Sequence, residues 1–381
     1  MGPTAYDPFG SLIPDAAGNL YGTTQYGGAH DVGTVFEFSP QSDGTWTEQI
    51  LYSFGGGEDG QYPAGSVIFD NAGNLYGTTQ LGGALLNGTV YELSPHGDGA
   101  WTESVLHSFG AGTSGEGPGL GLVLDSAGNL YGVTHNGGIY GDGLVFQLRH
   151  EHGEWGMTVL HNFDFDFAQD GVGPNNQMIF DSAGNLYGTT TFGGANNSGT
   201  VYELTPEADG SWTEQILWNF NQGSGSEVQC CLVFDAAGDL YGTAFAGGQY
   251  NQGTVFELIP QAGGAWTAHV LHSFGGDAAD GKMPSGVIFD AAGNLYGTTT
   301  EGGLYSLRHR PYGIAFKLTP EADGAWTETI LHSFGGGKDG AFPSGNLFLD
   351  AHGNLYGTTQ WGGTKTGPLA YSGTLFEIEL Q

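Results

Sequence analysis

The stretch FDNAGNLYGTTQLGG, from Phe69 to Gly83, decides the fold because close copies of it recur along the whole chain. The residue before Leu-Tyr-Gly marks each copy: Asn19, Asn74, Asn129, Asn185, Asp239, Asn294 and Asn354. Successive marks lie 54 to 60 residues apart. A period of this length corresponds to one supersecondary unit per copy, so the sequence predicts one array of seven units, a single domain over residues 1–381.

One repeat reads as four short antiparallel strands. In the second copy we expect strands over residues 66–69, 75–80, 89–93 and 101–109. In the turn Asp70–Gly73, Asp can bond its own backbone and Gly can adopt a positive φ. The last strand is apolar on both faces, with Trp101, Val105 and Phe109 on one and Leu106 on the other. Such strands, repeated seven times, predict an all-β, seven-bladed β-propeller of four-stranded antiparallel blades.

The two ends of the chain do not complete this pattern. Residues 4–10 align with the loop that precedes the first strand of a repeat, and residues 373–381 form the third strand of the last repeat. Only six copies of the fourth strand are therefore recognisable. We expect a seventh blade with three strands, or one whose outer strand was lost with an upstream segment.

The composition excludes several classes of partner. The chain has 40 Asp and Glu against 7 Lys and Arg, which gives a net charge of −33. Such a surface repels nucleic acid, anionic membranes and other copies of itself, so a monomer is expected. No apolar run approaches the roughly 18 residues of a spanning helix. The first residues, MGPTAYDP, do not have the pattern of a signal peptide.

The phrases D-x-A-G-N-L-Y-G-T-T and G-T-V-[FY]-E-L resemble the GloVer-type (Gloeo/Verruco) tandem repeat of secreted bacterial proteins, over essentially the whole chain. The D-x-x-G-N-L-Y part is also similar to the turn of NHL and virginiamycin-B-lyase-like propellers. This resemblance implies propeller architecture and an extracellular or periplasmic location. It permits binding or lyase roles without selecting one.

Functional residues are sought where one copy departs from the others, because positions shared by all copies are explained by folding. The basic residues are the first departure. Five of the seven fall in loops on one side of the last two repeats, which we call the top side: Lys282, Arg308, Arg310, Lys338 and Lys365. A basic patch on so acidic a chain could bind a carboxylate or sulfate, or it could pair with the protein's own carboxylates.

His135 is the second departure, because other copies have Gln, Thr or Phe at its position. Its loop adds Tyr140 and Asp142, so the three could serve acid–base chemistry or metal binding. A solvent-exposed histidine without such a role is the alternative. The histidines that recur in the fourth strand are interpreted as structural instead: His107, His161, His272 and His332.

The start of the first strand is the third departure. The fourth copy has Asn175, Asn176 and Gln177 there, and the fifth has Gln229 followed by Cys230-Cys231. The amides could bind a hydroxyl-rich ligand at the mouth of the central channel, or satisfy buried backbone groups. The adjacent cysteines could form a vicinal disulfide or remain two thiols on alternate faces.

Acidic residues form the last candidate group. Asp164 and Asp166 have no counterpart in other copies and could bind calcium or act on a sugar. Asp170 aligns with the Asp-Gly pair of other repeats and is interpreted as structural. No other metal and no organic cofactor is expected, because the chain lacks a phosphate-binding loop, a nucleophile elbow and a zinc-protease motif.

These observations favour a propeller that binds a carbohydrate, with an acidic carbohydrate suggested by the basic residues, at the centre of its top side. A polysaccharide or lactone lyase or hydrolase is the alternative, with His135, Arg308, His309 and Arg310 around the pocket. A scaffold or adhesion module without a small ligand is the third hypothesis.

Overall fold

The computed structural model describes residues 5–165, 170–228, 231–307, 310–363 and 372–380. Within this part the chain forms seven antiparallel blade sheets, and the fold is the predicted seven-bladed β-propeller. By its contacts the chain divides into two compact units, Met1–Phe163 with Gly173–Gln177, and Asp164–Val172 with Met178–Gln381. Each unit is described by itself.

The first unit carries blades one to three. Blade one contains β1 (Ala5–Pro8), β2 (Ile13–Pro14), β3 (Leu20–Gly27), β4 (Thr34–Pro40) and β5 (Trp46–Ser53). Blade two contains β6 (Gln61–Phe69), β7 (Leu75–Leu81), β8 (Thr89–Pro95) and β9 (Trp101–Ser108). Blade three contains β10 (Glu116–Pro118), β11 (Val123–Leu124), β12 (Leu130–Asn136), β13 (Leu144–Glu151) and β14 (Glu154–Asn162).

The second unit carries blades five to seven and blade four apart from Gly173–Gln177, which belong to the first unit. Blade four contains β15 (Gly171–Pro174), β16 (Ile179–Phe180), β17 (Leu186–Gly193), β18 (Thr200–Pro206) and β19 (Trp212–Asn219). Blade five contains β20 (Val233–Phe234), β21 (Leu240–Ala244), β22 (Thr254–Pro260) and β23 (Trp266–Ser273). Blade six contains β24 (Gly281–Phe289), β25 (Leu295–Gly302), β28 (Ile314–Pro320) and β29 (Trp326–Ser333), and a separate ribbon pairs β26 (Ser306–Leu307) with β27 (Arg310–Pro311).

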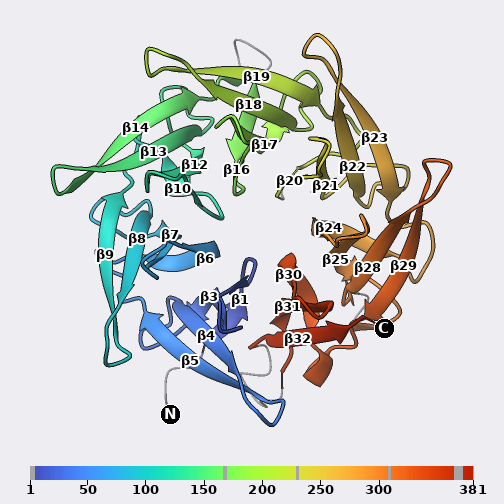
Figure 1. Cartoon of the computed structure of the whole chain (residues 1–381), viewed down its shortest axis with the longest axis horizontal. Coiled ribbons are helices and arrows are strands. Elements are labelled where there is room, and N and C mark those ends of the chain that lie inside the picture. Colours follow the sequence, from blue (N-terminus) through green and yellow to red (C-terminus); the bar gives the residue numbers. More distant parts are fainter. Residues whose placement is uncertain (1–4, 166–169, 229–230, 308–309, 364–371, 381) are drawn as a thin grey trace. The chain divides into compact units, whose positions relative to one another are not determined.

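The last blade confirms the expected three strands among the described residues. It contains β30 (Ala341–Leu349), β31 (Asn354–Trp361) and β32 (Thr374–Glu379), and a short 3₁₀ turn, η1 (Gly337–Asp339), precedes β30. Residues 5–8, as β1, pair with β3 in blade one. Every blade has the same strand order, and within a unit the first two strands of neighbouring blades contact each other, as β3 does β6 (Figure 1).

The quoted stretch works as a hairpin, as the sequence predicts. Asp70 accepts hydrogen bonds from the backbone of Ala72 and Asn74, at 2.8 and 2.9 Å, and from the Asn74 side chain at 2.8 Å. Packing explains why a glycine follows Leu-Tyr in this stretch. A Cβ at Gly77 would lie 2.4 Å from the hydroxyl of Tyr91, which is fully buried in the blade core.

Two details of the expected strands are wrong. The first strand of blade two begins at Gln61, five residues before the expected Ser66, because residues 61–64 already pair with β7. The fourth strand contains a bulge: Val90 pairs with His107 and Tyr91 with Val105, so Leu106 is the extra residue. The bulge changes the alternation, and Val105 is exposed while Phe109 is buried.

Candidate functional site

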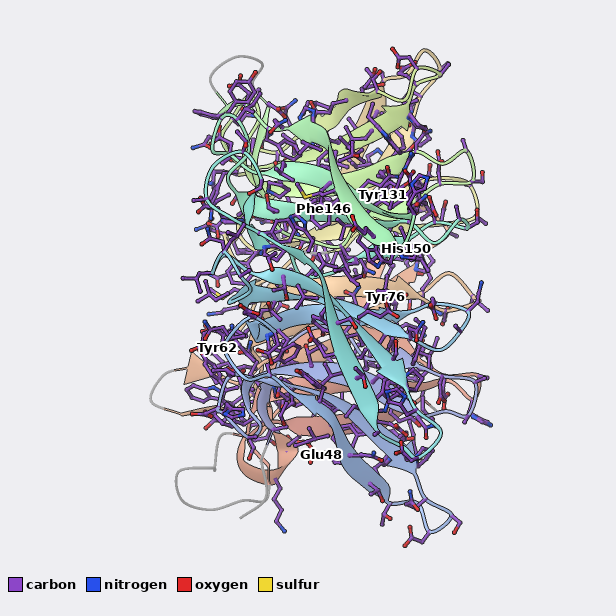
Figure 2. The ribbon with its side chains drawn as sticks, turned by 90° about the vertical axis from the view of Figure 1, so that its left-hand side faces the viewer. Glu48, Tyr62, Tyr76, Tyr131, Phe146 and His150 are labelled. Atoms are coloured by element: carbon purple, nitrogen blue, oxygen red, sulfur yellow. The ribbon has the colours of Figure 1, made fainter. Side chains whose placement is uncertain are left out.

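The blade loops separate into two sides, and the variable positions lie on one of them. The loops from the second to the third strand and from the fourth strand to the next blade share the top side. The Tyr62 backbone donates to Val32 O in such a neighbouring loop, at 2.8 Å. Figure 2 shows Tyr62 toward one side of the first unit and Tyr76 and Tyr131 toward the other, from which the hairpin loops extend.

An aromatic row lies on the top side of blades six and seven. It consists of Tyr312, Phe342 and Trp361. The ring centroids of Tyr312 and Phe342 are 6.0 Å apart, and those of Phe342 and Trp361 are 5.0 Å apart, both edge to face. Phe342 is 7% exposed and Trp361 38%, so the buried phenylalanine supports an indole that presents surface to solvent.

A groove of about 690 Å³ lies beside this row in the second unit. Leu304 and Tyr305, both more than half exposed, form part of its wall. His332 and Asp339 face each other in it, with His332 Nε2 2.9 Å from Asp339 Oδ1 and 3.1 Å from Oδ2. The groove has the volume of a small-ligand site and combines an exposed aromatic ring with a hydrogen-bonded His–Asp pair.

The turn η1 connects the groove with the aromatic row. Asp339 lies in the groove, and the ring of Tyr312 covers Gly336, where an added Cβ would lie 2.8 Å from the ring. Lys338, between them, is exposed. The row, the groove and this lysine therefore form one surface, which we call the sixth-blade surface.

The basic residues predicted for this region have different positions. Lys282 is half-buried and lies in β24, opposite Glu301, rather than in a loop as expected. Arg310 begins the β27 strand of the ribbon. Arg308, His309 and Lys365 lie outside the described residues, so their role stays a prediction.

His135 lies against the backbone of β15. The imidazole covers Gly173, where an added Cβ would lie 2.7 Å from its Cε1. Burial lowers the pKa of His135, and a hydrogen bond with the Gly173 backbone opposes this change. Tyr140 is exposed and Asp142 half-buried. The Asp142 backbone oxygen accepts from Gly173 N at 2.9 Å, so this segment has a clear part in packing.

The start of the fourth repeat contacts the backbone of blade three through the main chain of Asn175 and the side chain of Gln177. Asn175 O accepts from Leu120 N at 2.7 Å, and the Gln177 side chain donates to Leu122 O at 2.7 Å. Asn176 is buried. These contacts support the structural alternative for Gln177. Gln229 and Cys230 lie outside the described residues, and Cys231 is half-buried, so their ligand-binding role stays a prediction.

The acidic loop of the fourth repeat is only partly described. The Asp164 backbone donates to Asp170 Oδ2 at 3.0 Å, and Gly171 N donates to Asp170 Oδ1 at 2.5 Å. Asp170 thus anchors the loop, as expected for the Asp-Gly pair. Asp166 lies outside the described residues, and calcium binding there stays a prediction.

One structural position was missed by the sequence reasoning. An equivalent position at or near the start of the first strand in each repeat has a positive φ: Asp7, Tyr62, Gly117, Gly173, Glu227, Met283 and Phe342, with φ between 55° and 65°. Phe342 N donates to Tyr312 O of the preceding blade at 2.8 Å, and Met283 N donates to Gln252 O at the same distance. This conformation is unusual for a side chain larger than glycine. It places Phe342 in the aromatic row.

The described residues contain no helix with the length and apolar character of a membrane span. Among curated proteins, no sequence matches this chain significantly. Two solved structures share the fold, an ulvan lyase of polysaccharide lyase family PL25 and the same enzyme bound to -[GlcA(1-4)Rha3S]-, with TM-scores of 0.59 and 0.58 and identities of 11% and 10%. Both alignments cover 99% of this chain and 94% of the other.

A further solved structure, PorZ from Porphyromonas gingivalis, is 12% identical over 89% of this chain and 43% of its own, with a TM-score of 0.49. The sequence evidence is more specific than these likenesses in fold. The family model of the Gloeobacter/Verrucomicrobia repeat matches residues 2–182 and 173–381, and the chain belongs to this family.

Proposed function

We propose that this protein is an extracellular or periplasmic propeller that binds an acidic carbohydrate at the sixth-blade surface. The observation that carries the proposal is the exposed indole of Trp361, packed on Phe342. Two residues after Trp361, Gly363 N donates to Gly337 O at 2.8 Å, directly before the exposed Lys338. A flat aromatic face provides apolar surface for the C–H face of a sugar ring. An ammonium group beside it can pair with a carboxylate or sulfate on the next sugar.

Charge supports the acidic class of ligand. On a chain of net charge −33, an anionic sugar is attracted only where basic residues gather. Lys338 lies between the groove and the row, and Arg310 lies in the ribbon that follows the same loop as Tyr305. The PL25 enzyme provides one case in which this fold holds a polysaccharide that contains GlcA.

Calorimetric titration with uronic-acid oligomers tests the proposal. We expect Trp361→Ala to weaken binding by roughly 5- to 30-fold, corresponding to about 1–2 kcal/mol for a lost aromatic contact. Phe192→Ala is the matched control, because Phe192 occupies in β17 of blade four the position that Trp361 occupies in β31, and it is 41% exposed. Lys338→Gln should weaken binding of the acidic oligomer and leave neutral cello-oligosaccharides unaffected. Equal affinities of wild type, W361A and F192A would disprove the site.

An enzymatic role is the second candidate, favoured by the His332–Asp339 pair in the groove. Asp339 can orient the imidazole, and the imidazole can move a proton to or from a sugar bound along Tyr305. The test is product formation from uronic-acid polysaccharides by wild type and by His332→Gln. Turnover that persists in the folded H332Q variant would exclude this role. Calorimetric binding without turnover in wild type would support the binding function and exclude the enzymatic one.

A further inference from the structure

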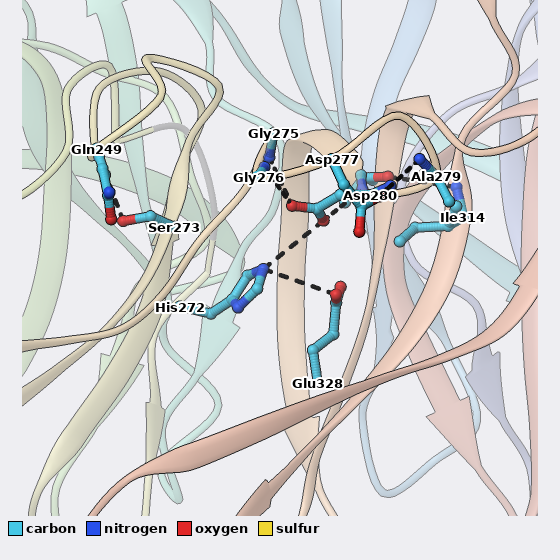
Figure 3. A network of polar contacts seen from close by, with 12 residues as sticks. Gln249, His272, Ser273, Gly275, Gly276, Asp277, Ala279, Asp280, Ile314 and Glu328 are labelled. Carbon is cyan, nitrogen blue, oxygen red and sulfur yellow. Dashed lines mark hydrogen bonds and ion pairs between the residues drawn. The ribbon is translucent and has the colours of Figure 1, made fainter.

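A second polar cluster lies in a different groove, between the outer strands of blades five and six. His272 lies on β23, Asp280 directly before β24 and Glu328 on β29. His272 Nε2 is 3.7 Å from Asp280 Oδ1 and 3.8 Å from Glu328 Oε2 (Figure 3). One nitrogen or oxygen atom from each residue lies within 4.8 Å of the other two. The cluster is entirely within the second unit.

These separations are too long for direct hydrogen bonds. The buried His272 Nε2 and the buried Glu328 Oε1 have no hydrogen-bond partner. The sixth blade offers a comparison, because His332 Nε2 approaches Asp339 Oδ1 to 2.9 Å. His272 is instead held at nearly equal distance from two carboxylates. Two orphaned polar atoms within one cluster of ligand-type side chains indicate room for a shared ligand.

The dimensions fit a tetrahedral zinc ion. Ligand atoms that are each about 2.1 Å from such an ion lie about 3.4 Å apart, so small movements from 3.7 and 3.8 Å would complete the site. Asp280 is oriented for this role by backbone donors, with Gly275 N and Gly276 N at 2.7 and 2.8 Å from Oδ2. Such outer contacts fix the position of a metal ligand.

The repeats show that the two carboxylates occur together. The corresponding residues in the sequence are Tyr52, Asp59 and Glu103; His107, Ser114 and Met157; His161, Asp170 and Glu214; Trp218, Ser224 and Ala268; His272, Asp280 and Glu328. In these five sets, Glu is present wherever Asp is present, and Met or Ala replaces Glu wherever Ser replaces Asp; the sixth pair, His332 and Asp339, faces a blade without a described fourth strand and so has no Glu to compare. A joint gain and loss is expected when both carboxylates serve one purpose.

Blade one provides an arrangement without the imidazole. The Tyr52 hydroxyl donates to Asp59 Oδ2 at 3.1 Å, so a phenol satisfies the carboxylate directly. This arrangement retains both carboxylates and lacks the nitrogen ligand. It therefore shows which substitution would remove metal binding from the fifth blade while preserving a packing that the fold already uses.

We propose that His272, Asp280 and Glu328 bind a divalent zinc ion, with its fourth position open to the groove. The groove has a volume of about 440 Å³ and includes Tyr250 and Asp277 in its lining, so water or a small ligand can reach the ion. The three side chains are 19%, 7% and 16% exposed, which protects the site from bulk solvent. Because the ligands come from two blades, the ion links β23 to β29.

The test measures zinc bound by the full chain, using zinc chloride and elemental analysis after dialysis. We expect His272→Tyr, which copies blade one, and Glu328→Ala, which copies Ala268 of blade five, each to bind one zinc ion fewer per chain than wild type. Comparing stoichiometries makes the result independent of any zinc held elsewhere. Glu103→Ala is the control and should leave the zinc content unchanged.

Cobalt substitution adds a readout that a packing role would not affect. Wild type should show visible absorption of four-coordinate cobalt that decreases in folded H272Y. If the variants fail to fold, zinc X-ray absorption of wild type must show imidazole and carboxylate ligands. Wild type that binds no zinc, folded variants with unchanged zinc content, or a ligand set without imidazole would each overturn the proposal.

Discussion

The hairpin of blade five has a defect that a single substitution should repair. In blade six, Asn294 donates its side-chain amide to Asp290 Oδ2 at 2.7 Å. In blade five, Asp239 stands at this position and has no amide to donate to Asp235. The pKa of Asp239 is raised by burial first, and then by the neighbouring carboxylates Asp235 and Glu257. Asp239→Asn should restore the hydrogen bond and remove this repulsion.

The expected gain in the free energy of unfolding is about 1 to 1.5 kcal/mol. A partly exposed hydrogen bond to a carboxylate contributes about 1 kcal/mol, and relief of one like-charge contact contributes about 0.5 kcal/mol or less. The unfolding entropy of about 2 cal/mol/K per residue makes this a shift of about 1 to 2 °C in the melting temperature. Chemical denaturation gives the more sensitive measurement, provided that the dependence of the unfolding free energy on denaturant concentration is the same in both proteins.

The pH dependence provides a further check. A carboxyl whose folded-state pKa is raised lowers stability as the pH rises above its unfolded value, near 3.9. The gain from D239N should therefore be largest near pH 7 and smallest near pH 3. Asn294→Asp is the matched reverse change and should lose a similar free energy. A D239N protein no more stable than wild type at pH 7, or a neutral N294D, would refute the reasoning.

Four further substitutions test other contacts. The pKa of Glu103 is raised to about 7, chiefly by burial, so the stability of the folded protein falls as the pH rises through 7 and this carboxyl ionises. Glu103→Gln should therefore reduce the decline in urea-unfolding free energy between pH 5 and 8 by about 1 kcal/mol, allowing for the partial exposure of the side chain. An unchanged decline would contradict this. Gly77→Ala should destabilise blade two by about 1–3 kcal/mol in the same assay, because the new methyl group overlaps Tyr91. The unfolding free energy of Met283→Gly should lie within about 1 kcal/mol of wild type, because relief of left-handed backbone strain offsets the lost side-chain contacts. Gly173→Ala should lower the unfolding free energy by more than about 1 kcal/mol, because it introduces that strain. The reverse order of the two variants would refute the strain argument.

The repeat was sufficient to predict the propeller and its hairpins. The spacing of Asn74 and its equivalents set the number of blades, and Asp70 and Gly73 identified the turn. The early start of the first strand was not predictable in the same way. It depends on backbone pairing of residues 61–64 with β7, and their sequence, QYPA, has no alternation of apolar and polar residues that would indicate a strand. The bulge at Leu106 likewise follows from register with the neighbouring strand.

The sequence indicated part of the sixth-blade surface. Lys338 and the lengthened loop that includes Arg310 were identified because they break the repeat. The aromatic residues beside them were missed, since Tyr312, Phe342 and Trp361 come from three separate segments and meet only through blade packing. No spacing rule along the chain relates them, and each alone reads as an ordinary aromatic residue at a strand end.

Recurrence alone treats the four histidines of the fourth strand alike, and their interpretation as structural stays a prediction. His272 was interpreted as structural because three other repeats share the residue, yet its partners differ from blade to blade. His332 meets Asp339 directly, whereas His272 stands apart from Asp280 and Glu328. In a tandem array, the chemistry of a position depends on combinations across neighbouring repeats. The informative comparison is therefore between whole sets of contacting residues, and our proposal that His272 is a metal ligand rests on that comparison.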